Sequence, residues 1–440
     1  MSAALADDAS REGPAWRAYL RALGPGLVTG ASDDDPSGIA TYAQAGAQFR
    51  YGLLWPALIT LPLMAAVQEI CDRTALATGR SLGELAAKKF AGRRRLLLGL
   101  LIAVLIVANT LNITADLLAV GSGMTLLHAG PTWVWALVAG VFITGFMIGG
   151  SFHLIARVFR LLCLALLAYL VVMVVAHPNW SSVVIHTVKP PLHFSSAYIA
   201  LLIAVLGTTI SPYLFFWQSA HRVEELREEP HGGKEAVALS KRPSAEAKRK
   251  ERMSRFDVFS GMAFSNAVMF AIIVSTAATL GNHGSTKIAS AAQAAQALRP
   301  VAGHAASVLF ALGFIGSGML AIPVLAGSGA AGMAGLLGKR WGFSRSPREA
   351  PVFYGLVVVG TAGGTLLSLF RVNPIHLLVV VATINGVAAA PFLLVVLLIS
   401  RDHKLMGKYR NGPLATTLGW LALGLMVAAA GALAAISAGI

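Results

Sequence analysis

Residues 33–38 read DDDPSG and lie inside an apolar run from Pro25 to about Ala47. Ionisable side chains at membrane depth are costly, and they are tolerated mainly where they face a cavity, an ion or a polar partner. Pro36 lacks a backbone N–H and Gly38 lacks a Cβ atom, so a continuous helix is not expected there. A broken helix exposes backbone groups that hydrocarbon cannot satisfy, so the break must line a polar site. The stretch predicts half of a cation site; the alternative is a loop at the membrane surface.

The composition is that of a polytopic membrane protein. Of 440 residues, 56% are hydrophobic and 12% are charged, whereas soluble domains contain about 25% charged residues. The apolar runs predict eleven spans, each near or above the ~20 residues that a spanning helix needs. These spans are 24–48, 52–78, 96–127, 132–152, 156–177, 196–222, 257–281, 303–334, 350–369, 373–400 and 413–438.

The net charge of +15 follows membrane topology. With the N-terminus in the cytoplasm, nearly all of the 35 lysines and arginines lie on the cytoplasmic side, as the positive-inside rule requires. The exceptions are Arg50, Lys189, Lys287, Arg299 and Arg371. We therefore expect a multi-pass protein of the plasma (inner) membrane, with a cytoplasmic N-terminus and an external C-terminus. The expected partners are the lipid bilayer and an ion, and no nucleic acid.

Residues 207–213 read GTTISPY and predict a second break, within the sixth span. Pro212 removes a helical hydrogen bond, and the hydroxyls of Thr208, Thr209 and Ser211 can line the opening; a simple proline kink is the alternative. The first and sixth spans are five spans apart, so they enter the membrane from opposite sides. This pattern is typical of two inverted five-helix repeats, as in LeuT-type transporters, with the substrate site where the broken helices meet.

The chain organisation follows from these spans. We predict an all-α polytopic membrane protein of the LeuT type. Its parts are a cytoplasmic N-terminal arm at 1–23, a first inverted repeat at 24–177, an external loop at 178–195, a second inverted repeat at 196–400 that includes a cytoplasmic loop at 224–256, and a final loop and span at 401–440. The cytoplasmic loop carries charges of both signs and is predicted to be a solvated, partly disordered connector.

The third span carries a polar stripe. Asn109, Asn112 and Asp116 recur at three and four residues and so share one helix face. Such a stripe faces the bundle or a water path. For the two amides, hydrogen bonding between helices is the alternative.

Two other spans contain candidate residues. Glu69 in the second span is either functional or paired with Arg73 at i,i+4. Thr383 and Asn385 in the tenth span can contribute oxygens to the site, and a packing role is the alternative for each. Between Val258 and Ser400 no predicted span contains an acidic residue, so intramembrane negative charge is confined to the first three spans.

Four short stretches carry a family resemblance. They are 24–26 (GPG) before the first break, 35–36 (DP) within it, 44–49 (QAGAQF) after it and 78–85 (TGRSLGEL) after the second span. Together they resemble the Nramp divalent-metal transporters over nearly the whole chain. The resemblance implies a LeuT-type fold, alternating access around a mid-membrane metal, and a transporter without enzymatic activity or a bound cofactor.

The resemblance implies that Asp35 binds the metal, and the other ligand positions differ. Gly38 stands where the family has a coordinating asparagine, Ser211 where it has a thioether, and Thr383 where it has a glutamine. A thioether favours softer transition metals, whereas carboxylate, hydroxyl, carbonyl and water suit Mg²⁺, Ca²⁺ or Mn²⁺. Mg²⁺ also keeps several of its waters. The pattern resembles the Nramp-related magnesium transporters, a branch of the same family.

Several positions of the family's proton path lack the histidine or glutamate that the family has there. Tyr213 and Gln218 stand at two histidines, and Ala119 stands at a glutamate, while Asp116 matches the path's aspartate. Proton relays use chains of Asp, Glu and His, so we expect weak or absent proton coupling. The predicted proton or ion path comprises Asp116, Asn109, Asn112, Glu69, Tyr213 and Gln218.

The predicted function is uptake of hydrated Mg²⁺ by a monomer; the alternative is a proton-coupled Mn²⁺ or Fe²⁺ importer of the same family. An intramembrane prenyltransferase would need two Asp-rich motifs, and the spans of the second half contain none. In an organic-solute carrier the triple aspartate would repel a substrate carboxylate. The predicted metal-site residues are Asp33, Asp34, Asp35, Gly38, Thr208, Thr209, Ser211, Thr383 and Asn385.

Overall fold

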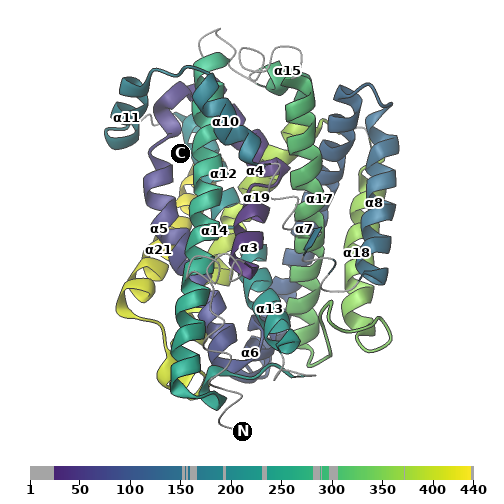
Figure 1. The fold of residues 1–440 in the computed structure, drawn as a ribbon, viewed down its shortest axis with the longest axis vertical. Coiled ribbons are helices and arrows are strands. Elements are labelled where there is room, and N and C mark those ends of the chain that lie inside the picture. Colours follow the sequence, from purple (N-terminus) through teal and green to yellow (C-terminus); the bar gives the residue numbers. More distant parts are fainter. Residues whose placement is uncertain are drawn as a thin grey trace, which may run out of the picture.

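The computed structural model describes residues 24–150, 154, 157–158, 166–191, 195–229, 235–280, 288, 290–296, 306–370 and 372–437, and these residues contain helices and no strand. Figure 1 shows a bundle whose long helices run along the vertical axis. We call its lower end, which carries α6, the α6 end, and its upper end, which carries α11 and α15, the α11 end. The predicted arm at 1–23 lies outside the described residues.

The helices follow the predicted order. The first half contains α3 (Pro25–Asp33), α4 (Pro36–Phe49), η2 (Arg50–Leu53), α5 (Pro56–Thr78), α6 (Leu82–Lys89), α7 (Arg93–Leu126), α8 (Thr132–Gly149), α10 (Leu167–Val175) and α11 (Trp180–Val188). The second half contains α12 (Ser196–Thr209), α13 (Pro212–Glu228), η4 (Leu239–Lys241), α14 (Ser244–Thr279), α15 (Ala291–Gln296), α17 (Ala306–Leu336), α18 (Pro351–Leu367) and α19 (Pro374–Ser400). The chain continues through α20 (His403–Met406), η7 (Gly407–Tyr409) and α21 (Pro413–Ser437).

Many of these helices are suited to a membrane. Within the described residues, seven helices are long and apolar enough to cross one, or up to nine if each of two bent pairs counts as one span. The two halves of the first predicted span have 9 and 14 residues. Neither half is long enough alone, because a span needs about 20 residues. The predicted fifth span, 156–177, is described continuously only from residue 166.

Both predicted helix breaks are confirmed. α3 ends at Asp33 and α4 begins at Pro36, while α12 ends at Thr209 and α13 begins at Pro212. Proline suits the first position of a helix because its N–H is not needed there and its φ is already helical. The half-helices also pair across the bundle, since α3 packs against α13 and α4 packs against α12. The two breaks therefore lie next to each other.

The predicted partial disorder of the connector at 224–256 is wrong for its described part, although several of its residues are exposed. α13 continues to Glu228, and α14 already begins at Ser244. Charges of both signs also pair with each other: Arg242, just before α14, and the half-exposed Glu246 are 2.9 Å apart. Lys250 lies 2.9 Å from Glu225, which links the start of α14 to the end of α13. The segment predicted as an external loop, 178–195, contains the short helix α11, and its side of the membrane stays a prediction.

Candidate metal-transport site

The two breaks are joined by tyrosine hydroxyls. The Tyr213 hydroxyl, at the start of α13, lies 3.0 Å from the Ser32 carbonyl oxygen and 3.4 Å from Asp35 Oδ2. On the other side of the breaks, Thr208 Oγ1 lies 2.8 Å from the Tyr42 hydroxyl of α4. One tyrosine thus connects the two half-helices nearer the α6 end, and the other connects the two nearer the α11 end.

Asp35 caps the N-terminus of α4. Its Oδ1 accepts hydrogen bonds from the Gly38 N–H at 2.8 Å and from the Ser37 hydroxyl at 2.6 Å. This arrangement is the preferred use of an aspartate just before a helix. The other oxygen, Oδ2, points toward Tyr213. One carboxylate oxygen is therefore engaged by the helix, while the second faces the meeting point of the breaks.

The two preceding aspartates are buried, and few hydrogen bonds offset the cost of burying their carboxylates. Asp33 and Asp34 are 0% exposed and Asp35 is 2% exposed. Asp33 Oδ2 accepts a hydrogen bond from the Ser265 hydroxyl of α14 at 2.7 Å. The same hydroxyl faces Asp34, but neither oxygen of Asp34 has a hydrogen-bond partner among the described residues. Burying an uncompensated carboxylate is costly, so these groups suit a site that receives a positive charge from outside the chain.

The aspartates do not form a ready-made chelating cluster. Asp33 is bonded to α14 and Asp35 to its own helix, and no group of three or more His, Cys, Asp or Glu side chains in the described parts of the chain is arranged to hold a metal. A cation here would need carbonyl, hydroxyl or water oxygens as further ligands, as hard divalent ions commonly use. Because the carboxylates are closed to solvent, ion exchange requires a different conformation.

The hydroxyls of the second break are turned toward their own helix. Ser211 Oγ donates toward the carbonyl oxygens of Gly207 and Thr208 at 2.7 and 2.9 Å. Thr209 Oγ1 lies 3.1 Å from the Val205 carbonyl oxygen. Their hydrogens are thus engaged, while their oxygen lone pairs are free to face a cation. Gly38 offers only backbone atoms.

The polar stripe of α7 divides into two parts. Asn112 Nδ2 donates to Asn385 Oδ1 at 3.2 Å, and Asn109 Nδ2 donates to the Leu325 carbonyl oxygen at 2.8 Å. These amides hydrogen-bond between helices, which was the alternative for them. Asp116 is fully buried, has no hydrogen-bond partner for either oxygen within the described residues, and lies within electrostatic range of Asp35.

Three predicted site residues have other surroundings. Glu69 pairs with Arg73 at 3.1 Å and with Arg255 at 3.0 Å, as its alternative role required. Gln218 Nε2 donates to Asp72 Oδ1 at 2.7 Å. Thr383 lines a cavity of about 420 Å³ whose walls include Gln44, Gln48 and His376.

Sequence reasoning missed three residues beside the aspartates. Tyr42 bonds to the second break, and Ser265 is the donor to Asp33. Tyr169 of α10 lies near Asp34, and its buried hydroxyl has no hydrogen-bond partner in the described structure. An aromatic or small residue in an apolar span is typical of packing, so only the tertiary contacts distinguish these three.

The fold and the site define a class of protein. A bundle of apolar helices, with two broken helices meeting at buried carboxylates, is the architecture of a LeuT-type membrane transporter. Residues 26–435 match the family described as "Natural resistance-associated macrophage protein-like", or Nramp. The chain belongs to the Nramp family, whose members are transporters and not enzymes.

Individual relatives agree with this assignment. A "Divalent metal cation transporter MntH" from Acidiphilium cryptum is 27% identical over 403 residues, which cover 89% of this chain and 85% of the relative. A protein of the same name from Aeromonas hydrophila is 27% identical over 430 residues, with 94% and 95% covered. Among solved structures, an Eremococcus coleocola manganese transporter matches with a TM-score of 0.73 at 18% identity, covering 97% of this chain and 88% of its own.

A second solved structure supports the fold. Mhp1, a nucleobase-cation-symport-1 family transporter, matches with a TM-score of 0.57 at 15% identity, over 94% of this chain and 93% of its own. The predicted all-α LeuT-type fold, the Nramp membership and the transporter class are thus confirmed. The magnesium branch stays a prediction, because the relatives are named for divalent metals and manganese.

Proposed function

We propose that this protein carries a divalent metal cation across a membrane by alternating access, with Mn²⁺ as the first candidate ion. The observation that carries the proposal is the set of buried, under-compensated carboxylates at the meeting point of the two breaks. The names of the relatives favour Mn²⁺ over the Mg²⁺ that the sequence predicts. They therefore favour the alternative ion.

Each residue at the breaks has a proposed role. Asp35 coordinates the ion through the oxygen that faces Tyr213. The Thr208 carbonyl and the oxygens of Ser211 and Thr209 complete the shell, directly or through water. Asp33 and Asp34 attract the hydrated ion. Asn385 is bonded to Asn112 and would reach the ion through water.

A specific feature favours Mg²⁺ as the second candidate. Ser211 provides a hydroxyl, and the described residues around the breaks provide carboxylate, carbonyl and hydroxyl oxygens but no sulfur. Such a set suits Mg²⁺ as well as Mn²⁺. A Ser211→Met variant should favour Mn²⁺ or Cd²⁺ over Mg²⁺ in calorimetric binding. An unchanged preference would mean that Ser211 does not face the ion.

We propose that transport is coupled weakly or not at all to protons. Asp116 matches the aspartate of the family's proton path, but Ala119, three residues later, stands in place of its glutamate. Coupling is also not needed energetically. A divalent cation entering at ~100 mV gains roughly 4.6 kcal/mol, twice the ~2.3 kcal/mol per unit charge.

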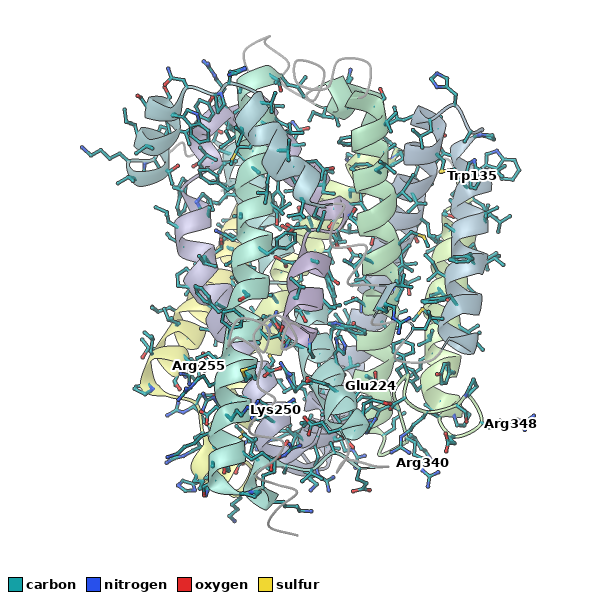
Figure 2. The ribbon with its side chains drawn as sticks, viewed as in Figure 1. Trp135, Glu224, Lys250, Arg255, Arg340 and Arg348 are labelled. Carbon is teal, nitrogen blue, oxygen red and sulfur yellow. The ribbon has the colours of Figure 1, made fainter. Side chains whose placement is uncertain are left out.

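We propose that the protein lies in the plasma membrane, with its α6 end facing the cytoplasm. Figure 2 shows Lys250, Arg255, Arg340 and Arg348 at that end, with Trp135 near the other. Cationic loops stay preferentially on the cytoplasmic side. A protease-cleavable tag placed between α20 and α21 tests this orientation in sealed cells. We expect no cleavage by a protease added outside, and cleavage from outside would contradict the proposed orientation. We also propose a monomer.

The central test is ion flux into liposomes that contain the purified protein. Asp35→Asn removes the charge but keeps an N-cap residue of equal quality. Asp402→Asn is a matched control, because Asp402 caps α20 outside the proposed site. We expect Asp35→Asn to reduce Mn²⁺ flux at least about tenfold, equivalent to ~1.4 kcal/mol, and Asp402→Asn to leave it unchanged. Equal flux in both variants would place the site elsewhere.

The same liposomes test ion choice and coupling. Parallel measurements with Mn²⁺ and Mg²⁺ rank the two candidates directly. A pH dye inside the liposomes reports protons that enter with the metal. No acidification during metal entry is expected; acidification in step with the metal would identify the proton-coupled importer instead.

A further inference from the structure

The short half-helix α3 is held at its N-terminus by a carboxylate from another helix. Asp257 of α14 accepts hydrogen bonds from the backbone N–H groups of Gly24 and Gly26, both at 2.8 Å, and of Leu27 at 3.2 Å. The first N–H groups of a helix have no partner within it, and a negative charge there also complements the helix dipole. α3 has no side-chain cap of its own, so Asp257 supplies that function.

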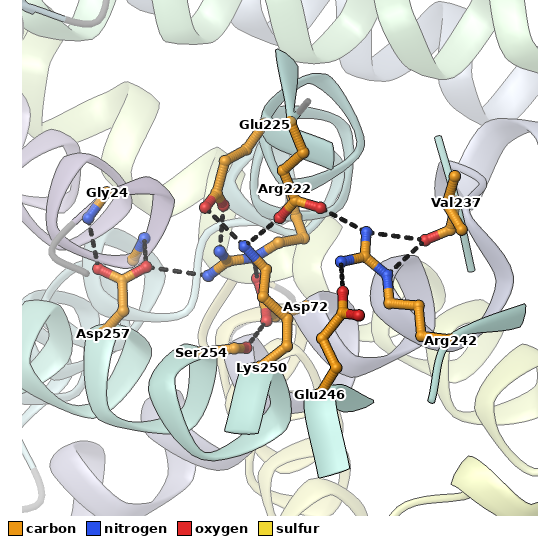
Figure 3. A network of polar contacts seen from close by, with 12 residues as sticks. Gly24, Asp72, Arg222, Glu225, Val237, Arg242, Glu246, Lys250, Ser254 and Asp257 are labelled. Carbon is orange, nitrogen blue, oxygen red and sulfur yellow. Dashed lines mark hydrogen bonds and ion pairs between the residues drawn. The ribbon is translucent and has the colours of Figure 1, made fainter. Parts of the chain in front are cut away.

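Asp257 is itself bound to the other inner half-helix. Arg222 of α13 places Nη2 2.9 Å from Asp257 Oδ2 and Nε 2.6 Å from Asp72 Oδ1 of α5. Figure 3 shows Arg222 between these two carboxylates. The three side chains are 2%, 0% and 1% exposed, in the order Arg222, Asp257 and Asp72. We call these three residues the Arg222 cluster.

A second contact ties α3 to the same cluster. The Thr29 hydroxyl, in the middle of α3, hydrogen-bonds to Gln218 Oε1, and Gln218 Nε2 donates to Asp72 at 2.7 Å. α3 also packs with its backbone against α14, since a Cβ atom added to Gly30 would lie 2.1 Å from the Gly261 carbonyl oxygen. α3 is therefore docked along its length, and its polar attachments lead to Asp72 and Asp257.

Stability alone does not explain such a cluster. Replacing a buried ion pair with well-packed apolar side chains is often neutral or stabilising. Charged contacts have a different property, because they are strong when closed and can be replaced by water when they separate. In this protein, the charged contacts of Asp257 join α3 to α13. These are the two half-helices that lie between the breaks and the α6 end.

We propose that the Arg222 cluster is the gate on the α6 side of the transport path. It holds α3 against α13 and α14 while the aspartates are closed to solvent, and α3 leaves Asp257 and Gln218 when the path opens toward the α6 end. The inference rests on the proposed function, because it assumes that an ion passes there.

The test measures opening separately from transport. The reporter is Ser32→Cys in a background where both native cysteines, Cys71 and Cys163, are alanine. Ser32 is fully buried and directly precedes the aspartates. A membrane-impermeant thiol reagent is applied to each side of sealed vesicles, and the rate of labelling reports access from that side.

Two matched substitutions compare the gate with another part of the same polar network. Arg222→Lys keeps one charge but cannot bridge two carboxylates with a planar fork. Arg242→Lys is the control, because Arg242 contacts Glu229 and Glu246 and lies in the same network without touching α3. From the α6 side we expect labelling at least about fivefold faster in Arg222→Lys, the lower range of conformational coupling. No acceleration is expected in Arg242→Lys.

A milder variant protects the test against misfolding. Thr29→Val removes the hydroxyl that contacts Gln218 without a large change in shape or charge, and we expect about twofold faster labelling from the α6 side. Unchanged labelling in both Thr29→Val and folded Arg222→Lys would overturn the gate, as would faster labelling from the opposite side. Mn²⁺ flux of the unmodified protein is measured in parallel. Its absence would contradict the proposed function while leaving the labelling result valid for the gate's mechanics.

Discussion

Two groups of buried carboxylates in this bundle are compensated in opposite ways. Asp72 and Asp257 share the Arg222 guanidinium and accept several further hydrogen bonds. Asp34, equally buried, has no hydrogen-bond partner among the described residues. A buried charge must be compensated, so the first group is complete within the protein, whereas the second fits the proposed arrival of a cation. This difference in compensation separates the proposed transport site from the Arg222 cluster.

The largest expected effect comes from breaking the compensated group. Asp257→Ala leaves Arg222 with one carboxylate fewer and exposes the α3 N-terminus without its cap. Removing one partner of a buried ion pair typically costs about 3–5 kcal/mol. We expect a loss of that size in the free energy of unfolding, measured by denaturant titration of the protein in detergent. A loss below about 1 kcal/mol would mean that the cluster is hydrated and weak.

The opposite sign is expected for the under-compensated group. Asp34→Asn keeps the side-chain shape and removes a charge that is offset in the described structure by no cation and by no hydrogen bond of its own, since the nearby Ser265 hydroxyl donates to Asp33. The metal-free protein should become more stable by about 1 kcal/mol or more, because a neutral amide is less costly to bury than an uncompensated carboxylate. The same denaturant titration checks this. Added Mn²⁺ should stabilise the unmodified protein more than the variant, and destabilisation of the metal-free variant would contradict the contrast.

A smaller effect is expected from the two tyrosine bridges. Tyr42→Phe removes the contact between α4 and α12, and Tyr213→Phe removes the contact between α13 and α3. Each loses about one hydrogen bond, or ~1 kcal/mol, which corresponds to roughly a fivefold change in a two-state equilibrium. With the Ser32→Cys reporter, Tyr42→Phe should increase labelling from the α11 end and Tyr213→Phe from the α6 end. If both variants increased labelling from the same end, the two tyrosine bridges would not control separate sides of the path.

The breaks were predictable because their chemistry is local. Pro36 and Pro212 interrupt helices wherever they stand in an apolar span, and the aspartates before Pro36 mark that break as polar. The asparagines of α7 were also found by their helical spacing, although spacing could not reveal that Asn112 pairs with Asn385. Sequence thus located both breaks and the aspartates of the first one, while their role as a metal site stays a proposal.

The contacts that complete the site were not predictable, because they join distant parts of the chain. Ser265 and Asp33 are 232 residues apart, and Arg222 and Asp72 are 150 apart. The error at 224–256 has a related cause. Its charge content indicates solvation when the segment is considered alone, but α14 brings Lys250 against Glu225.

The smallest expected effect belongs to a carboxylate outside the spans, Asp402, which extends the comparison to a partly exposed site. A hydrogen bond from Lys89, together with the backbone N–H groups of α20, lowers the pKa of Asp402 below its usual value of 3.8. A group whose pKa is lower in the folded state stabilises the fold above its unfolded pKa, and that stability is lost as the pH falls through the folded value. We therefore expect Lys89→Gln to cost no more than about 1 kcal/mol at pH 7. The cost should disappear at an acidic pH well below 3.8, at which Asp402 is protonated in the folded protein as well. Denaturant titrations of the Lys89→Gln and unmodified proteins at both pH values measure this difference.

In an Asp402→Asn background, which keeps the cap and lacks the charge, Lys89→Gln should cost nothing at either pH. A cost that persisted there would show that Lys89 stabilises the fold through another group. If Lys89→Gln cost as much stability as Asp257→Ala, burial would not explain the strength of the Arg222 cluster. The contrast between the carboxylate groups would then fail.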